Sequence, residues 1–399
     1  MSTPASQEQP APDELQPYNG EVVRGRRGSV EEARALDSGS AERSTTLSHS
    51  GSAERSTTLK EARFHELDVL RGLAAIAVVY CHFISQCHQL GRLPFEFRWG
   101  SYGPHLFFMI SGFVIFMTLN HCRRPMDFVF SRFSRLYPMY WMGVLCSTLV
   151  IVAVGSTETS LTVKQFLINL TMLQTWLKVP DIEVAYWTLG VELKFYGLMF
   201  IVLWLRKSGW IEWLSGGWLV AVIAYRCVDS LFGLPNALST PLILDYAQLF
   251  VAGIMFYRLR CEGESYARHA LISASIPLAF IAEGTEVACF TLGFVGVFYL
   301  FLYQQLVWLN FAPLRWLGSM SYALYLVHGA LGYAMINALH AQHMPTPLLL
   351  TLPTIVCLAL SAVLTNQFEQ PLLKRMRQWY RSDAGRTPVR LGNSAPELA

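Results

Sequence analysis

The sequence predicts an all-α protein: a polytopic membrane helix bundle of about ten transmembrane helices with a disordered N-terminal tail. Of the 399 residues, 53% are hydrophobic and only 15% are charged, whereas a soluble globular chain carries about 25% charged residues. Beyond residue 63, apolar stretches alternate with short polar breaks. The first 63 residues, in contrast, are rich in Pro, Ser, Glu and Arg.

The N-terminal segment, residues 1–63, shows no apolar period. Such a segment cannot bury enough apolar surface to offset the entropy lost on ordering it. Its decapeptide SGSAERSTTL occurs at 38–47 and again at 50–59, but two copies are too few for a solenoid. We therefore expect a disordered cytoplasmic tail, followed by a membrane domain at 64–376 and a cytoplasmic C-terminal tail at 377–399.

Ten apolar stretches are candidate membrane spans, because a helix needs about 20 apolar residues to cross a bilayer. They cover residues 67–86, 104–120, 136–154, 186–205, 212–228, 240–257, 269–283, 287–304, 316–337 and 346–367. The seventh is short and the fifth carries Arg226, so these two are the weakest. Lys and Arg are concentrated in the loops on the side of the N-terminal tail, and this bias places both termini in the cytoplasm.

Charge and cysteine usage exclude several classes of protein. The net charge of +3 is too small to predict nucleic-acid binding. Eight cysteines are scattered without a Cys-x-x-Cys pair, which argues against a disulfide framework and against a zinc site. His340 and His343 lie in one loop without an obvious third ligand, so no metal site is expected there.

Ionisable residues interrupt the first span, where a buried charge costs several kcal/mol and often marks function. Asp68 and Arg71 are three residues apart and therefore neighbours on a helix. His82 follows Arg71 by eleven residues, so it lies on the same helix face and about 16 Å further along the axis. The three residues form either a catalytic stripe or an interfacial ion pair with a histidine that bonds a neighbouring helix.

The segment FVFSRFSRLYPMYW (128–141) carries Arg132 and Arg135 three residues apart, followed by Tyr137. Two guanidinium groups at this spacing suit a phosphate-bearing ligand. The alternative is that these residues only mark the cytoplasmic end of a membrane helix, where Arg and Tyr are common. Glu192 lies inside the fourth span, in YWTLGVELKFYG. A carboxylate at that depth needs a partner, and it serves either in a buried ion pair or in contact with substrate.

Ser321, Tyr325 and His328 recur at helical spacing in the ninth span, within GSMSYALYLVHG. Hydrogen bonding between helices is the simpler interpretation of each residue alone, and together they are candidate substrate contacts. The tenth span ends in FEQPLLKR, where Glu369 lies at the cytoplasmic exit and Pro371 is expected to stop the helix.

Six strings occur in an order that resembles acyltransferase family three, the multi-pass membrane O-acyltransferases. They are LDVLRGLAAIAVVYCHF, YGPHLFFMISGFVIF, RFSRLYPMYW, YWTLGVELKFY, LGSMSYALYLVH and FEQPLLK. The resemblance covers roughly residues 64–376, nearly the whole membrane part. It implies an integral-membrane enzyme that moves an acyl group, usually acetyl, from cytosolic acyl-CoA to a hydroxyl of a glycan, lipid or small molecule.

Four elements of the family have counterparts in this chain. They are R-x10-H at Arg71 and His82, R-x-x-R at Arg132 and Arg135, the carboxylate before Phe-Tyr at Glu192, and the Tyr/His helix at Tyr322, Tyr325 and His328. One departure is that Pro104 and His105 precede LFF, where the family often has Val-Asp or a similar pair. No role for the family's acid at that position is therefore expected here.

The resemblance and the residue pattern together define the predicted site. Its members are catalytic His82, Arg71, Glu192 and Asp68, donor-binding Arg132, Arg135 and Tyr137, and substrate-binding Tyr325, His328 and Ser321. We hypothesise that His82 is the catalytic base or an acyl relay. No metal and no bound cofactor are expected, since acetyl-CoA or another acyl-CoA serves as donor substrate.

The expected partners are acyl-CoA, a hydroxyl-bearing glycan or lipid acceptor of the cell envelope, and the lipid bilayer of the inner (cytoplasmic) membrane. The rival hypothesis is a transporter or flippase for a polar envelope precursor, in which the same ionisable groups line a translocation path. Transporters often show internal repeats, whereas the clear repeat in this sequence lies in the N-terminal tail.

Overall fold

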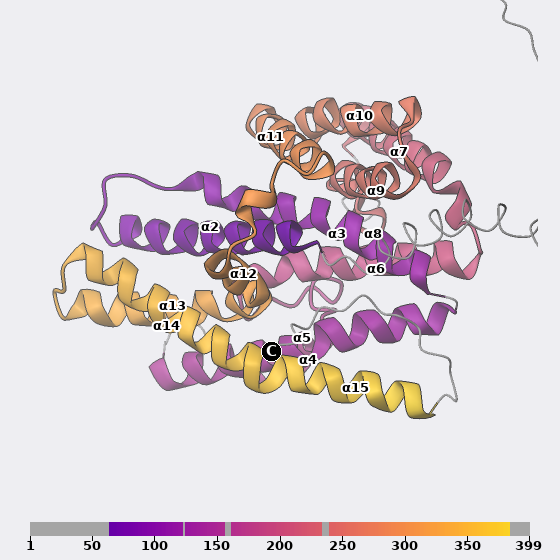
Figure 1. Ribbon diagram of the computed structural model, residues 1–399. Coiled ribbons are helices and arrows are strands. Elements are labelled where there is room, and N and C mark those ends of the chain that lie inside the picture. The colour runs from indigo at the N-terminus through magenta and orange to yellow at the C-terminus, as the bar shows by residue number, and fades with distance from the viewer. Residues whose placement is uncertain (1–63, 123, 156–160, 234–238, 384–399) are drawn as a thin grey trace, which may run out of the picture. The chain divides into compact units, whose positions relative to one another are not determined.

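The computed structural model describes residues 64–122, 124–155, 161–233 and 239–383, and every regular element within these ranges is helical. The all-α prediction is confirmed (Figure 1). The α-helices are α2 (His65–Gln89), α3 (Gly103–His121), α4 (Pro125–Val154), α5 (Val163–Leu170), α6 (Trp187–Trp204), α7 (Ile211–Phe232), α8 (Ser239–Leu242), α9 (Ala247–Glu262), α10 (Tyr266–Glu283), α11 (Thr285–Leu302), α12 (Ala312–Ser319), α13 (Ser321–Ala341), α14 (Thr346–Leu364) and α15 (Gln370–Asp383). The predicted tail at 1–63 and the end of the chain from residue 384 lie outside the described residues.

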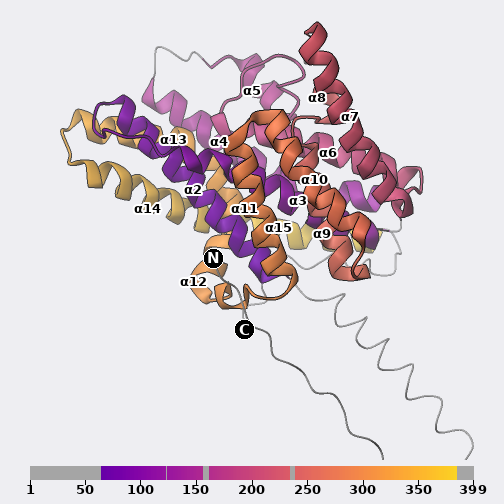
Figure 2. The same cartoon turned by 90° about the horizontal axis from the view of Figure 1, so that it is seen from above.

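Nine helical stretches in the described ranges are long and apolar enough to cross a membrane. They are α2, α3, α4, α6, α7, α8 with α9, α11, α13, and α14 with α15, some including a short 3-10 turn at one end. The seventh expected span, 269–283, corresponds to α10, which is absent from these nine. Arg268, His269 and Glu283 lower its hydropathy. The helix nevertheless packs against α9 and α11 (Figure 2).

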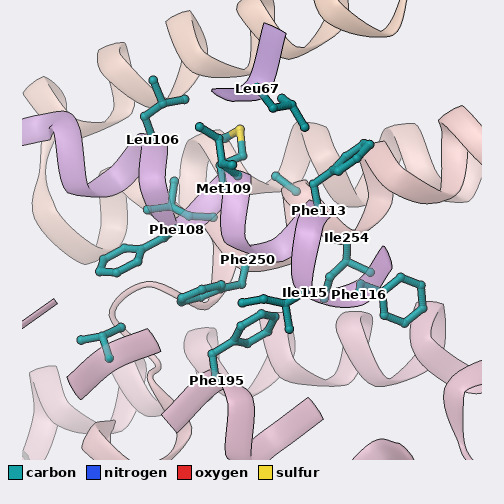
Figure 3. Packing of buried hydrophobic residues seen from close by; sticks show 14 of the residues in the cluster. Leu67, Leu106, Phe108, Met109, Phe113, Ile115, Phe116, Phe195, Phe250 and Ile254 are labelled. Atoms are coloured by element: carbon teal, nitrogen blue, oxygen red, sulfur yellow. The ribbon is translucent and has the colours of Figure 1, made fainter. Parts of the chain in front are cut away.

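Helices α3 and α9 form the centre of the packed bundle. Phe108 and Phe113 of α3 lie in the same buried cluster as Phe250 of α9 (Figure 3). The two backbones touch at glycines: a Cβ at Gly253 would lie 2.0 Å from the carbonyl oxygen of Met109. Small residues at such crossings let membrane helices approach closely and gain van der Waals contact.

The helices that carry the sequence motifs pack around α13, which contacts both α2 and α4. The short helix α12 also presses on the start of α2. A Cβ at Gly318 would lie 2.4 Å from the carbonyl oxygen of Asp68, and one at Gly72 would lie 2.7 Å from the Gly318 nitrogen. These close approaches fix the first turns of α2 against the end of α12, and thereby fix the position of Arg71.

The expectation that Pro371 stops the last helix is wrong. Helix α14 runs through a π turn at Thr365–Glu369 directly into α15, and Pro371 is the second residue of α15. A proline inside an α-helix clashes with the carbonyl four residues earlier, and the wider π turn just before it relieves that clash. The helix therefore continues past residue 376, the expected end of the membrane domain.

Gly253→Ala is expected to lower the free energy of unfolding by about 3 kcal/mol, because the added Cβ forces the α3 and α9 backbones apart. Thermal melting of detergent-purified protein measures the effect. The matched control is Gly296→Ala in α11, where a Cβ meets no atom within 4 Å. The control should melt at or above the wild-type temperature, since Ala favours a helix over Gly. Equal melting of the two variants would contradict the close contact.

Candidate active site

A cavity of about 100 Å³ lies among α2, α3, α4, α6 and α13. Its polar lining consists of three guanidinium groups, one carboxylate and six hydroxyl groups. These belong to Arg71, Arg132, Arg135, Glu192, Ser111, Thr188, Tyr196, Ser321, Tyr322 and Tyr325. The lining therefore carries more positive than negative charge, which suits an anionic ligand.

Within the described part of the chain, two of the three arginines have no carboxylate at hydrogen-bond distance. Among the described residues, the acid nearest to Arg71 is Asp68, at 4.0 Å between guanidinium nitrogen and carboxylate oxygen. Arg132 donates to the hydroxyl oxygens of Thr118 at 2.9 Å and Ser131 at 3.2 Å, and it lies 5.9 Å from the ring centroid of Tyr196. Hydroxyl oxygens leave a guanidinium charge uncompensated, so both groups retain the capacity to pair with an anion.

The third arginine, Arg135, is paired. It donates to Oε1 of Glu369, whose side chain is almost fully buried, and it lies 5.8 Å from the ring centroid of Tyr322. Glu369 is the last residue of the π turn, so the irregular backbone there presents its carboxylate to α4. The structure thus adds an acidic neighbour to Arg135 that the spacing of the two arginines does not reveal.

Glu192 extends from α6 into the cavity lining. Its Oε1 accepts hydrogen bonds from the hydroxyl of Ser111 at 2.8 Å and from that of Tyr196 at 2.9 Å. Within the described residues, Oε2 accepts no hydrogen bond. The carboxylate is therefore held by two hydroxyl donors and keeps one oxygen for a ligand, which deviates from the simple buried ion pair considered above.

His82 lies outside the cavity lining, beside His328 of α13. Nδ1 of His82 is 2.9 Å from Nε2 of His328, and the two rings are stacked with centroids 5.1 Å apart and planes 11° apart. His328 is fully buried and His82 is half-buried. An imidazole pair in direct hydrogen-bond contact is able to orient one ring and to hold or pass a proton.

A thin layer of side chains separates the cavity from the two histidines. Val78, Ala185 and Tyr325 pack together there with Phe107, and Phe107 and Tyr325 also line the cavity. The Tyr325 and Thr188 hydroxyls hydrogen-bond at 2.9 Å. Arg71 and His82 therefore lie on one face of α2, as expected, but of the two only Arg71 lines the cavity.

The remaining predicted residues occupy mixed positions. Ser321 lines the cavity, and its hydroxyl donates to the Gly318 carbonyl at 2.9 Å. Asp68 lies next to the cavity beside Arg71. Tyr137 points away: its hydroxyl donates to the Thr171 carbonyl and its ring stacks on Phe133. The structure therefore does not bring Tyr137 together with Arg132 and Arg135.

Several polar residues of this region carry no sequence signal of their own. Ser111, Thr188 and Tyr196 are ordinary residues of apolar helices until the fold turns them into the cavity. Glu183 is the most unusual of them, because its nearly buried carboxylate accepts the backbone N–H of Ala330 at 2.8 and 3.1 Å. Burial raises the pKa of Glu183 to about 7, and the Ala330 N–H bond acts in the opposite direction.

A profile of the family described as "Acyltransferase domain" matches residues 64–366. The relatives of the chain include acyltransferase MdmB of Streptomyces mycarofaciens, 29% identical over 186 residues that cover 43% of this chain and 48% of MdmB. The exopolysaccharide production protein ExoZ of Rhizobium meliloti (strain 1021) is 26% identical over 183 residues, 44% of this chain and 56% of ExoZ. The chain thus spans about half the length of these relatives. No solved structure matches it.

Glu369→Gln is expected to lower the free energy of unfolding by about 3 kcal/mol, because it leaves the Arg135 guanidinium inside the bundle without its acid. The double variant Glu369→Gln/Arg135→Gln should be more stable than Glu369→Gln alone, since no charge then remains unpaired. Melting temperatures in detergent test both statements. A double variant that melts below either single variant would refute the pairing.

Proposed function

The chain belongs to acyltransferase family three. On that premise we propose that it transfers an acyl group, with acetyl as the first candidate, from acyl-CoA to a hydroxyl of an envelope glycan, lipid or small molecule. As a family member with nine membrane-capable helices in its described part, it is a membrane acyltransferase. The observation that carries the proposal is the cavity with Arg71 and Arg132, neither of which has a carboxylate at hydrogen-bond distance among the described residues, close to an imidazole pair.

Acyl-CoA fits the charge of this cavity. Its phosphates are the kind of anion that guanidinium groups bind by charge-assisted hydrogen bonds. Arg132 is the first candidate to hold a phosphate, because among the described residues its guanidinium contacts hydroxyl oxygens and an aromatic ring but forms no ion pair. We place this end of the bundle at the cytoplasmic face of the inner membrane, with both termini inside, since the basic loops favour that orientation.

The proposed chemistry is direct transfer with His82 as general base. The imidazole takes the proton of the acceptor hydroxyl while the hydroxyl oxygen attacks the thioester carbonyl carbon. The tetrahedral intermediate collapses with cleavage of the C–S bond, and the imidazolium returns its proton to the CoA thiolate. The Tyr325 hydroxyl, which lies in the layer between the cavity and the histidines, would stabilise the oxyanion. Arg71 lies about 16 Å from His82 along α2 and would instead bind the phosphates of the donor.

The layer between the cavity and His82 must open during the reaction. Tyr325 is the residue whose movement achieves this, because its ring lies in the layer and its hydroxyl is held by Thr188 alone among the described side chains. Breaking one neutral hydrogen bond costs about 1 kcal/mol. This small cost allows a ligand that fills the cavity to displace the ring and bring the thioester to the imidazole.

The acceptor is proposed by analogy with the relatives. ExoZ is named for exopolysaccharide production, and a sugar hydroxyl is a nucleophile of the kind that the proposed step requires. The hydroxyl would reach the half-buried His82 from outside the cavity lining; Tyr333, which is also outside that lining, lies 6.3 Å from His82 between ring centroids. Donor and acceptor would then approach the imidazole from opposite sides of the Tyr325 layer.

His82→Ala is expected to lower the rate of acyl transfer by at least about 100-fold, because a positioned general base contributes that much or more. Membranes that contain the protein are incubated with acetyl-CoA labelled on the acetyl group, with butyryl- and octanoyl-CoA in parallel. Label on a lipid or glycan acceptor demonstrates transfer, whereas movement of a glycan or lipid without label favours the transporter hypothesis. Wild-type rates in a folded His82→Ala protein would remove His82 from the mechanism.

Arg132→Gln is expected to raise the acyl-CoA concentration needed for half-maximal rate by about 10-fold, the loss of about 1.4 kcal/mol of binding. The maximal rate should change less, because Arg132 lies away from the reacting atoms. Arg98→Gln is the matched control, since Arg98 is exposed and outside the cavity lining. An unchanged half-maximal concentration in Arg132→Gln would show that the donor phosphates bind elsewhere.

A further inference from the structure

We infer that His328 is a positioning residue that fixes the tautomer of His82, so that Nε2 of His82 is the atom that takes the acceptor proton. The inference rests on the proposed function and deepens it, because the resemblance and the sequence pattern assign His328 to substrate contact.

The proton on His328 is located by two backbone carbonyl groups. Nδ1 of His328 lies 2.9 Å from the Tyr325 carbonyl oxygen and 3.2 Å from the Leu324 carbonyl oxygen. A carbonyl oxygen only accepts hydrogen bonds, so Nδ1 must carry the hydrogen that both of them share. The opposite tautomer would turn a nitrogen lone pair toward two oxygen lone pairs, which is repulsive.

The other nitrogen of His328 is then an acceptor. The ring is 0% exposed and, within the described chain, no carboxylate hydrogen-bonds to it. A charge buried without a partner is costly, so the ring is neutral and its Nε2 carries a lone pair. That lone pair faces Nδ1 of His82 at 2.9 Å, and His82 must therefore donate from Nδ1.

The consequence for His82 is a free Nε2. In a neutral imidazole with its hydrogen on Nδ1, Nε2 is unprotonated and basic. Within the described residues it makes no hydrogen bond, and the side chain is half-buried, so an acceptor hydroxyl can approach it. The relation resembles that of the third group in a catalytic triad, which holds an imidazole in the correct tautomer and orientation without reacting itself.

A residue outside α13 also holds the turn that carries His328. Glu183 accepts the N–H of Ala330, two residues after His328. The absent side chain of Gly329 makes room for that carboxylate, since a Cβ there would lie 2.3 Å from Oε1 of Glu183. The turn that carries His328 is thus held both by the carbonyls of its own helix and by the Glu183 carboxylate.

The test compares His328→Leu with His328→Gln, using the transfer of labelled acetyl from acetyl-CoA in membranes, per amount of folded protein. Leu offers no acceptor to His82, and its maximal rate should fall by about 10- to 100-fold, as when an orienting partner is removed. The half-maximal acetyl-CoA concentration should hardly change. Gln places an oxygen near the position of Nε2 and should restore most of the rate. His88→Leu is the control, because His88 bonds the Leu93 carbonyl away from the pair.

Two results would overturn the inference. A folded His328→Leu protein with the wild-type maximal rate shows that no acceptor is needed, and equal losses in the Leu and Gln variants show that His328 acts otherwise. If the Leu variant does not fold, ¹⁵N spectra of histidine-labelled wild-type protein decide: His82 must carry its proton on Nδ1. A failure of the proposed function is distinguishable, because the His82→Ala variant then keeps its activity whatever His328 does.

Discussion

The site depends on placing guanidinium groups inside a helix bundle where carboxylates pair with them only in part. Arg135 is bonded to Glu369, Arg71 lies 4.0 Å from Asp68, and the described partners of Arg132 are hydroxyl oxygens and an aromatic ring. Such charges are costly in an apolar bundle unless water or a ligand compensates them. The cavity is therefore a structural requirement of these residues as well as the feature that allows an anion to bind.

Close backbone contact is the means by which the bundle holds these groups. Gly318 of α12 lies against the Asp68 carbonyl, which fixes the turn that carries Arg71. Gly329 leaves room for the Glu183 carboxylate beside the turn that carries His328. In a membrane the hydrophobic effect does not drive helices together, so association relies on such contacts and on hydrogen bonds between helices. The same glycines that stabilise the fold therefore determine the geometry of the site.

The sequence predicted the fold class and the shared helix face of Arg71 and His82, because a 3.6-residue period fixes which side chains of one helix align. It could not predict that Tyr325 separates them, since that depends on the depth at which α13 crosses α2. Tyr137 shows a different error: it follows Arg135 by two residues, and a helix turns side chains at that spacing to different faces. The π turn before Pro371 was also hidden, because local propensity identifies proline as a helix stop.

The separation of the cavity from the histidine pair has a chemical consequence for a thioester donor. A base that activates a hydroxyl also activates water, and hydrolysis of the donor would follow if both met in one wet cavity. Here the charged lining that needs water lies on one side of Tyr325, and the imidazole pair lies on the other. Under the proposed mechanism, donor binding and base catalysis would therefore take place in different surroundings. Thioester and base would come together only when the donor fills the cavity, and the donor would then have displaced the water that competes with the acceptor hydroxyl.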